Sequence, residues 1–506
     1  MVVLAMVYMS VGFSDLSPAF SYLQLISLPE KFYLYLSINK KRTMFSKETY
    51  IKRRQQLARD VNKGLLLFIG NSESPMNYHD NTYRYRQDSS FLYFFGLNHP
   101  DLAGIIDAET GEETIYGDDY TIDDIVWMGT QPTIRDRAST SGINKTATSS
   151  QLINDLQQAK SKGRQIHFLP VYRGESKIKL FQYLGVNPSE TQKKSSLEFV
   201  KAVIKQRNYK STEEIVEIEK AVNTTVDMHL AGMRMARAGM TEAQIAAEVE
   251  RIPIAEDGYI SFPVIATING QTLHNHYHGN TLKEGDMFLL DAGAETSMGY
   301  AGDMSSTFPV SKTFTSRQRD IYQVSLNSHE AAIKMLKPGV SFKEVYYESA
   351  RELMRGMKEL GFVKGDVDEA VMAGAHAMFF PCGLGHMMGM DVHDMEDLGE
   401  QYVGYDNEEK SKQFGAKSLR LGRKLEPGFV LTIEPGIYFI PQLIDLWKSE
   451  NRFSDFLIYD KIEQYKDFGG CRNEEDFLIT ETGFRLLGRP LPKTIKDVEN
   501  ERLKAF

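Results

Sequence analysis

The sequence predicts a mixed α/β (α+β) protein with two domains behind a short non-core segment. Three observations support this fold class. Helical and strand-like segments alternate up to about residue 190, long amphipathic helices follow, and strands with helical interruptions fill the remainder. A chain of 506 residues is also longer than a single hydrophobic core normally serves.

Composition excludes several classes of protein. The 42% hydrophobic and 25% charged fractions are typical of a soluble globular protein, and a net charge of -9 gives no electrostatic footprint for nucleic acid. The chain has only two cysteines, Cys382 and Cys471, which excludes a disulfide framework. A reducing compartment is the simpler assumption, so we expect a cytoplasmic protein.

The first 43 residues form a separate case. The apolar start resembles a signal peptide, but no Lys or Arg precedes the apolar run and Asp15 ends it after about a dozen residues. The segment is also too short for a membrane span, so we expect no membrane partner. Met44 begins a helical sequence, and we therefore interpret residues 1–43 as a non-core N-terminal extension.

Residues 44–205 are expected to form the first α/β domain. A helix is predicted at 48–58 and apolar strands at 64–70, 90–97, 102–107 and 166–170. The three histidines of this region, His79, His99 and His167, have no metal-ligand spacing and are interpreted as structural. The domain is expected to shape a neighbouring site.

Residues 206–506 are expected to form the second domain. Apolar residues at helical spacing predict two or more long helices at its start, with a turn at Gly239 and a new helix capped by Thr241 and Gln244. Beyond Phe262 the pattern changes to strands, which are interrupted by helices at about 316–360 and 365–379.

Four acidic residues and one histidine in distinctive short contexts carry the functional prediction. The candidates, in chain order, are Asp291, Asp303, His386, Glu434 and Glu474. Four carboxylates and a neutral imidazole nearly balance the charge of two divalent cations. The sequence therefore predicts a hydrolase with a two-metal site.

The segment 287–308 is predicted to form a hairpin. If its turn centres near Ser297, Asp291 and Asp303 face each other directly across the ladder, with Cβ atoms about 5 Å apart. Two such carboxylates repel each other unless a cation lies between them. The alternative is a hairpin with two solvated acids.

Two further segments add candidates. His386 lies in a glycine-rich loop as a candidate ligand, and His393 could donate to a carbonyl oxygen or move protons, although either histidine could be structural. Glu434 is the only charged group of an apolar strand, so a cation or a proton must offset its burial. For the last ligand, spacing leaves Glu474, Glu475 and Asp476 open.

The order and wording of these segments resemble the pita-bread metallopeptidases, which include methionine aminopeptidase, Xaa-Pro aminopeptidase and prolidase. The N-terminal portion resembles the creatinase-like domain that Xaa-Pro aminopeptidases and prolidases share. The resemblance implies hydrolysis of the bond before proline, and it favours Glu474 because that residue stands two after Arg472. Asp303 and Glu474 would then bridge two ions, Mn2+ first, with Co2+, Fe2+ or Zn2+ as alternatives.

The same resemblance assigns roles around the metals. His274 and His393 would contact substrate, Glu434 would handle a proton of the attacking water, and Arg472 is counted among the substrate contacts. Arg420 resembles a prolidase arginine that pairs with the substrate carboxylate, against the alternative of an exposed arginine in a charged loop. His276 and His278 are interpreted as loop histidines.

We therefore expect a prolidase-like enzyme that prefers Xaa-Pro dipeptides. The alternatives are an Xaa-Pro aminopeptidase that acts on longer peptides, a creatinase-like hydrolase and a metal-free binding protein. The resemblance further implies a homodimer. Cys382 departs from the family pattern, because relatives carry a histidine four residues before His386, and its oxidation is expected to impair activity.

Overall fold

The computed structural model describes residues 44–506, which form one compact unit. The predicted N-terminal extension, 1–43, lies outside the described residues. Within 44–506, no helix is both long and apolar enough to cross a bilayer.

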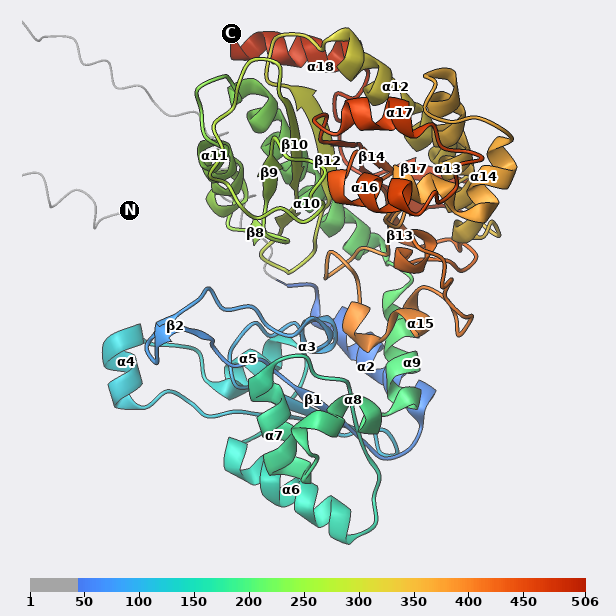
Figure 1. The fold of residues 1–506 in the computed structure, drawn as a ribbon. Coiled ribbons are helices and arrows are strands. Elements are labelled where there is room, and N and C mark those ends of the chain that lie inside the picture. Colours follow the sequence, from blue (N-terminus) through green and yellow to red (C-terminus); the bar gives the residue numbers. More distant parts are fainter. Residues whose placement is uncertain (1–43) are drawn as a thin grey trace, which may run out of the picture. The chain divides into compact units, whose positions relative to one another are not determined.

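A five-stranded mixed sheet organises the first part of the chain (Figure 1). Its order is β6-β5-β4-β1-β7, with antiparallel central pairs and a parallel strand at each edge. The strands are β1 (Leu65–Ile69), β4 (Ala103–Asp107), β5 (Glu113–Tyr116), β6 (Lys145–Ala147) and β7 (Ile166–Phe168), and a short hairpin joins β2 (Pro75–Tyr78) to β3 (Asn81–Thr82). The helices are α2 (Lys47–Val61), α3 (Ser89–Phe95), α4 (Ile122–Met128), α5 (Ile134–Thr140), α6 (Ser149–Ser161), α7 (Gly174–Leu184) and α8 (Thr191–Lys194).

The predicted helix and strands of this region are confirmed with one exception. The strands expected at 64–70, 102–107 and 166–170 are present, but the expected strand at 90–97 is the helix α3. The side chain of Asp88 accepts a hydrogen bond of 2.9 Å from the Phe91 N–H, which caps the helix, and Gly96 ends it at φ +67°. Every residue of α3 is buried, so its apolar run shows no helical period in the sequence.

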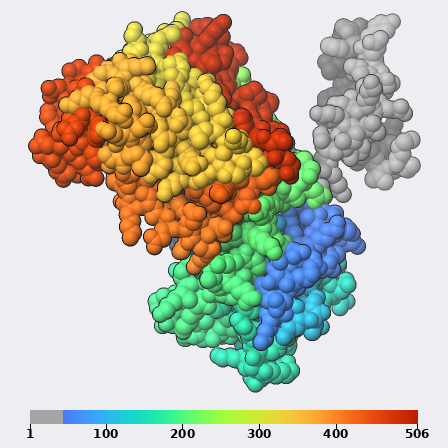
Figure 2. Space-filling model, turned by 90° about the vertical axis from the view of Figure 1, so that its right-hand side faces the viewer, coloured from blue at the N-terminus to red at the C-terminus, as the bar shows by residue number. Residues whose placement is uncertain are grey.

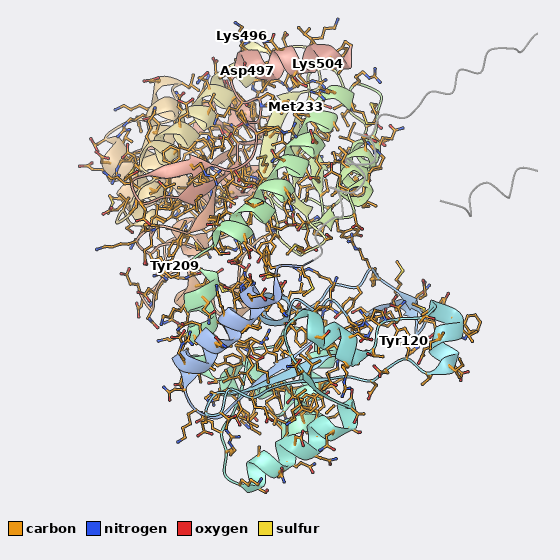
Figure 3. All side chains as sticks on the ribbon, turned by 180° about the vertical axis from the view of Figure 1, so that it is seen from behind. Tyr120, Tyr209, Met233, Lys496, Asp497 and Lys504 are labelled. Atoms are coloured by element: carbon orange, nitrogen blue, oxygen red, sulfur yellow. The ribbon has the colours of Figure 1, made fainter. Side chains whose placement is uncertain are left out.

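Two consecutive helices connect the two parts of the chain. They are α9 (Leu197–Arg207) and α10 (Thr212–Met235), and α9 packs against α2 (Figure 2). Tyr209 lies at the turn between them (Figure 3), where its hydroxyl donates to Glu426 at 2.6 Å. The next helix, α11 (Glu242–Ala255), has the expected capping box between Thr241 and Gln244.

Small sheets and the helices around them form the second part. The strands are β8 (Tyr259–Ile260), β9 (Ile265–Thr267), β10 (Met287–Ala292), β11 (Ala294–Glu295), β12 (Met304–Pro309), β13 (Val430–Ile433), β14 (Gly436–Tyr438), β15 (Gly470–Arg472), β16 (Glu475–Ile479) and β17 (Phe484–Leu486). The helices are α12 (Ser316–Lys334), α13 (Phe342–Glu359), α14 (Val367–Ala373), α15 (Glu400–Val403), α16 (Pro441–Ser449), α17 (Tyr459–Ile462) and α18 (Ile495–Arg502). Helix α10 packs against β10 and β12, whereas α12 packs against β13, β14 and β15 (Figure 1). The helical interruptions expected at 316–360 and 365–379 are confirmed.

The predicted register of the 287–308 hairpin is wrong by two residues. Asp291 pairs with Ser305, not with Asp303. The turn centres on Met298, because the Thr296 N–H donates to the Tyr300 carbonyl and Gly299 takes φ +84°. Asp303 is therefore a diagonal neighbour of Asp291, two residues from its direct partner and still on the same face.

Candidate metal centre

Most of the candidate ligands lie within or next to short strands. Asp291 lies within β10 and Asp303 immediately precedes β12. Glu434 lies between β13 and β14 and not within a strand, where the sequence analysis placed it, and Glu474 lies between β15 and β16, directly before β16. His386 comes from a loop that follows α14.

Backbone hydrogen bonds join these distant segments. The Glu474 N–H donates to the Ser305 carbonyl at 3.0 Å, and the Glu434 N–H donates to the Leu384 carbonyl at 2.7 Å. The side chains are thus held by the main chain before any ion binds.

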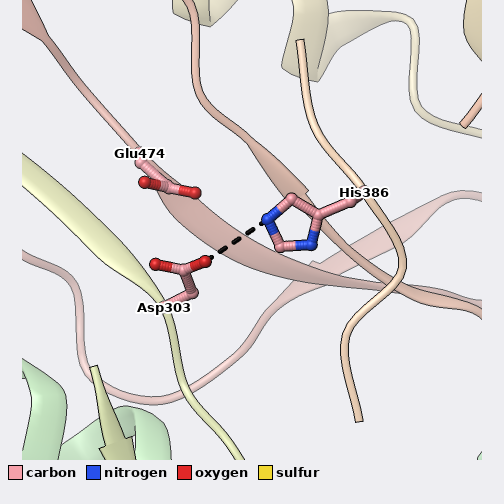
Figure 4. A group of neighbouring side chains, drawn as sticks. All are labelled: Asp303, His386 and Glu474. Atoms are coloured by element: carbon pink, nitrogen blue, oxygen red, sulfur yellow. Dashed lines mark ion pairs between the residues drawn. The ribbon is translucent and has the colours of Figure 1, made fainter. Parts of the chain in front are cut away.

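Three of the predicted ligands meet in one buried cluster (Figure 4). Asp303, His386 and Glu474 each offer an atom within 4.8 Å of the others. The His386 Nε2 lies 3.3 Å from Asp303 Oδ2 and 3.6 Å from Glu434 Oε1, so Glu434 adjoins the cluster. Four of the five predicted ligands therefore lie in or next to one cluster.

The fifth residue, Asp291, pairs with an arginine. Arg472 Nη2 contacts Asp291 Oδ2, while Nε donates to Ser305 Oγ at 2.8 Å and Nη1 donates to the Tyr438 hydroxyl at 2.7 Å. Ser305 Oγ in turn donates to Glu474 Oε2 at 2.7 Å. One guanidinium thus steadies two predicted ligands, one directly and one through a hydroxyl.

Burial and mutual repulsion shift the protonation of the acids. Burial, and then the charge of Asp291, raise the pKa of Asp303 to about 8. Burial also raises the pKa of Glu434 and holds that of Glu474 well above its ordinary value. Asp303 Oδ1 is fully buried and has no hydrogen-bond partner among residues 44–506. Divalent cations would relieve both the repulsion and this unpaired oxygen, so the residues fit a metal centre.

His386 has the tautomer that a ligand needs. Its Nδ1 lies 3.1 Å from the Met387 carbonyl and donates to it, which leaves the lone pair of Nε2 facing Asp303 and Glu434. Burial lowers the pKa of His386, and the neutral form is the one that binds metal.

A cavity of about 700 Å³ opens beside the cluster. Its walls include all five predicted ligands and the other predicted site residues: His274, Asp291, Asp303, His386, His393, Arg420, Glu434, Arg472 and Glu474. His276 also lines the cavity from its loop, whereas His278 lies 3.1 Å from the Val264 carbonyl. The sequence thus located the residues of a single concave site.

His393 and Arg420 are linked at the edge of this cavity. The His393 ring lies 4.3 Å from the His386 ring, centroid to centroid. Its Nδ1 lies 2.6 Å from Glu396 Oε2, and Arg420 Nε lies 3.4 Å from the same oxygen. Arg420 Nε is also 3.7 Å from Glu400 Oε1, and the Arg420 side chain is 32% exposed.

The N-terminal part contacts segments next to the site and does not line the cavity itself. No residue of 44–205 lines the 700 Å³ cavity. Instead, Arg86 donates to the Met390 carbonyl at 2.8 Å and pairs with Glu295 at the same distance. The Ser89 hydroxyl donates to Asp391 at 2.5 Å. The expected role in shaping a neighbouring site is thus played through the 390–394 loop.

Cys382 also lines the cavity. Burial, and then the charge of Glu434, raise the pKa of its thiol to about 12. Because the thiolate is the reactive form, this thiol is a slow target for oxidation at neutral pH. Impairment by oxidation stays a prediction. Cys471 is buried in β15.

Several supporting residues were absent from the predicted site. They are Ser305, Glu396, Lys417 and Tyr438. The spacing of three between His393 and Glu396 is the one sequence signal that could have indicated a contact. The others depend on strand register and loop packing, which the sequence does not display.

Comparison with known proteins agrees with this fold. The model of metallopeptidase family M24 matches residues 216–481, and that of the aminopeptidase P N-terminal domain matches residues 50–167. The first match covers more than half of the chain, which therefore belongs to metallopeptidase family M24. The predicted order of a creatinase-like domain followed by a pita-bread domain is confirmed.

Relatives in this family fall into two named activities. The chain is 30% identical to the Xaa-Pro aminopeptidase of Escherichia coli, over 90% of this chain and 97% of the relative. It is 28% identical to the Xaa-Pro dipeptidase of Homo sapiens, over 87% and 89% of the two chains. A solved substrate complex of Escherichia coli aminopeptidase P superposes with a TM-score of 0.76 at 28% identity, covering 91% of this chain and 99% of that one.

Proposed function

We propose that this protein is a metal-dependent exopeptidase that cleaves the Xaa-Pro bond at the N-terminus of dipeptides. The observation that carries the proposal is the buried cluster of Asp303, His386 and Glu474, which opens into a cavity with Arg420 on its wall. Relatives named for Xaa-Pro hydrolysis support the same reaction.

The metal centre in this proposal holds two divalent ions. Asp291, Asp303, His386, Glu434 and Glu474 would be the ligands. Oxygen-rich ligand sets favour Mn2+, with Co2+, Fe2+ or Zn2+ as alternatives. When bound, the ions would supply Lewis-acid activation of water and of the scissile carbonyl.

The remaining roles belong to the protein's own groups. Glu434 has a side chain 22% exposed at the cavity, where its carboxylate can accept a proton from water. His274 and His393 line the same cavity and can donate to a substrate carbonyl oxygen. Arg472 is retained as a substrate contact, and its hydrogen bonds also orient Asp291 and Ser305.

Arg420 determines substrate length in this proposal. Its Nε faces Glu396, and its Nη atoms make no hydrogen bond to any residue within 44–506. A guanidinium with free Nη groups can bind the carboxylate that follows proline in a dipeptide. Longer Xaa-Pro peptides lack a carboxylate at this point.

The second candidate is an Xaa-Pro aminopeptidase. A cavity of about 700 Å³ has room for more than a dipeptide, and the Escherichia coli relative carries that name. A creatinase-like reaction and a metal-free binding role agree less well with the retained ligand set. We further propose a homodimer, a cytoplasmic location, and domain limits of 44–205 and 206–506.

Steady-state kinetics on three substrates separate these candidates. The purified protein is loaded with Mn2+ and assayed on Ala-Pro, Ala-Pro-Ala and creatine. We expect the highest kcat/KM on Ala-Pro and no turnover of creatine. Equal or faster release of alanine from Ala-Pro-Ala would establish the aminopeptidase instead.

A further inference from the structure

Glu396 touches two residues of the cavity wall without lining the cavity itself. Its Oε2 accepts from His393 Nδ1 at 2.6 Å and from Arg420 Nε at 3.4 Å. His393 and Arg420 both line the 700 Å³ cavity, whereas Glu396 lines a second cavity of about 440 Å³ behind them. His393 lines both cavities, so it forms part of the wall between them.

We infer that Glu396 is a positioning residue that holds His393 and Arg420 in one hydrogen-bonded row, coupling the histidine beside the metal centre to recognition of the substrate carboxylate. This inference rests on the proposed function, which gives His393 and Arg420 their roles.

The contact with Glu396 fixes the state of His393. A carboxylate that accepts from Nδ1 requires the proton to be on that nitrogen, which leaves Nε2 for the cavity. The hydrogen bond from His393 is the main cause that lowers the pKa of Glu396 to about 2. Glu396 is therefore an anion throughout the neutral range.

The same contact orients Arg420. Glu396 Oε2 and Glu400 Oε1 both face Nε, at 3.4 and 3.7 Å. Because these anions face the Nε edge of the guanidinium, its Nη groups stay available for a carboxylate in the cavity.

The backbone that carries Glu396 is anchored on its N-terminal side. Asp394 is buried and pairs with Arg207 and Lys210, each at 2.7 Å. Met395 then takes φ +60°, and a 3₁₀ turn begins at Glu396. A positive φ at a non-glycine residue persists only where its surroundings enforce it. The backbone directly before Glu396 is thus held in place by the buried ion pairs of Asp394.

Three variants test the inference in the Mn2+-loaded full-length protein. Glu396→Ala removes both contacts, and Glu396→Gln keeps an acceptor for His393 but loses the charge. Asp397→Asn is the matched control, because it neutralises the neighbouring acid of the same turn, which makes no hydrogen bond to either partner.

The measurements are kcat on Ala-Pro and the inhibition constant of free L-proline. For Glu396→Ala we expect kcat to fall about 10-fold and the proline constant to rise about 5-fold, the scale of one lost charge-assisted hydrogen bond each. Glu396→Gln should change kcat less than about 3-fold yet still weaken proline binding. Asp397→Asn should match the wild type in both.

A double-mutant cycle gives a second readout. Arg420→Ala should make the proline constant insensitive to Glu396→Ala, because the guanidinium that Glu396 orients is gone. Additive effects of the two substitutions would contradict the inference. So would wild-type kcat and proline binding in both Glu396 variants. If Glu396→Ala unfolds the protein, kcat and proline binding of Glu396→Gln alone test the inference.

The failures of the two ideas are distinguishable. A wild-type enzyme that leaves Ala-Pro intact overturns the proposed function and the inference together. A wild-type enzyme that cleaves Ala-Pro, with Glu396 variants that behave like Asp397→Asn, overturns the inference alone.

Discussion

Asp303 shows most directly why the site needs a cation. It is buried, one of its oxygens has no hydrogen-bond partner in the described part of the chain, and its pKa is raised to about 8 from an ordinary value of 3.8. Removing metal should therefore leave a cluster of acids that hold protons they would lose in the unfolded chain.

This protonation gives the metal-free protein a defined pH dependence. Between pH 3.8 and 8 the folded state binds a proton at Asp303 that the unfolded state has released, so the free energy of unfolding falls as pH rises. The lowered pKa of His386 has the opposite sign, but it acts only below its ordinary value of 6.5. Between pH 6.5 and 8 the change in unfolding free energy therefore reports on the buried carboxylic acids and not on His386.

We predict a loss of about 2 kcal/mol in unfolding free energy from pH 6.5 to 8 in the presence of chelator. Urea denaturation at the two pH values measures it. Asp303→Asn should reduce the loss, and saturating Mn2+ should abolish it. Stability that stays level or rises in the chelated wild type would show that Asp303 is already ionised.

Arg420 carries a separate prediction about substrate length. Arg420→Ala should raise KM for Ala-Pro about 10-fold or more, since a bidentate contact to a carboxylate is lost. KM for Ala-Pro-Ala should change little. Arg423→Ala, which breaks a pair with Glu426 nearby, is the control. An equal change on both substrates would assign Arg420 a structural role.

Individual ligands were more predictable from sequence than their partners. Glu434 is indicated by its position as a lone charge between apolar residues, and His386 is indicated by its glycine-rich loop. Nothing in the sequence marks Ser305 as the hydroxyl between Arg472 and Glu474, because that contact depends on how β12 and β15 lie side by side.

At the scale of elements, two predictions failed for physical reasons. The segment 90–97 is apolar because α3 is buried on every side, so helix and strand look alike in sequence. The predicted register of the 287–308 hairpin was wrong by two residues because its loop from Thr296 to Tyr300 centres one residue later than expected. Since the error is an even number of residues, both aspartates still lie on the same face of the sheet.

The 390–394 loop depends on α9 for its position. Arg207 Nη2 lies 2.7 Å from Asp394 Oδ1 and 3.0 Å from Asp391 Oδ2, and the Arg207 side chain is only 3% exposed. Removing one partner from a buried network leaves an uncompensated charge. This loop contains His393, so its displacement should reach the site.

We predict that Arg207→Ala lowers the unfolding free energy by about 3 kcal/mol and lowers kcat on Ala-Pro. Lys205→Ala is the matched control on the same helix, where an exposed lysine pairs with Asp60 and should contribute less than about 1 kcal/mol. Denaturant titration and turnover of both variants check the prediction. Equal stability of the two variants would contradict it.

At the scale of the molecule, the two parts divide the work. Residues 216–481 match family M24 and contain every predicted ligand, whereas the first part contributes anchors such as Arg86 and Ser89. The domain order could be predicted from sequence, since each part has its own pattern of elements. The contacts between them could not, because they join residues some 300 positions apart.

The most direct test of the central claim is a Mn2+ titration of the metal-free protein, with Ala-Pro hydrolysis measured at each step. The five-ligand site predicts that activity is absent under chelation and reaches its plateau at two equivalents of Mn2+ per chain. Hydrolysis that persists without metal, or a protein that binds no Mn2+, would contradict it.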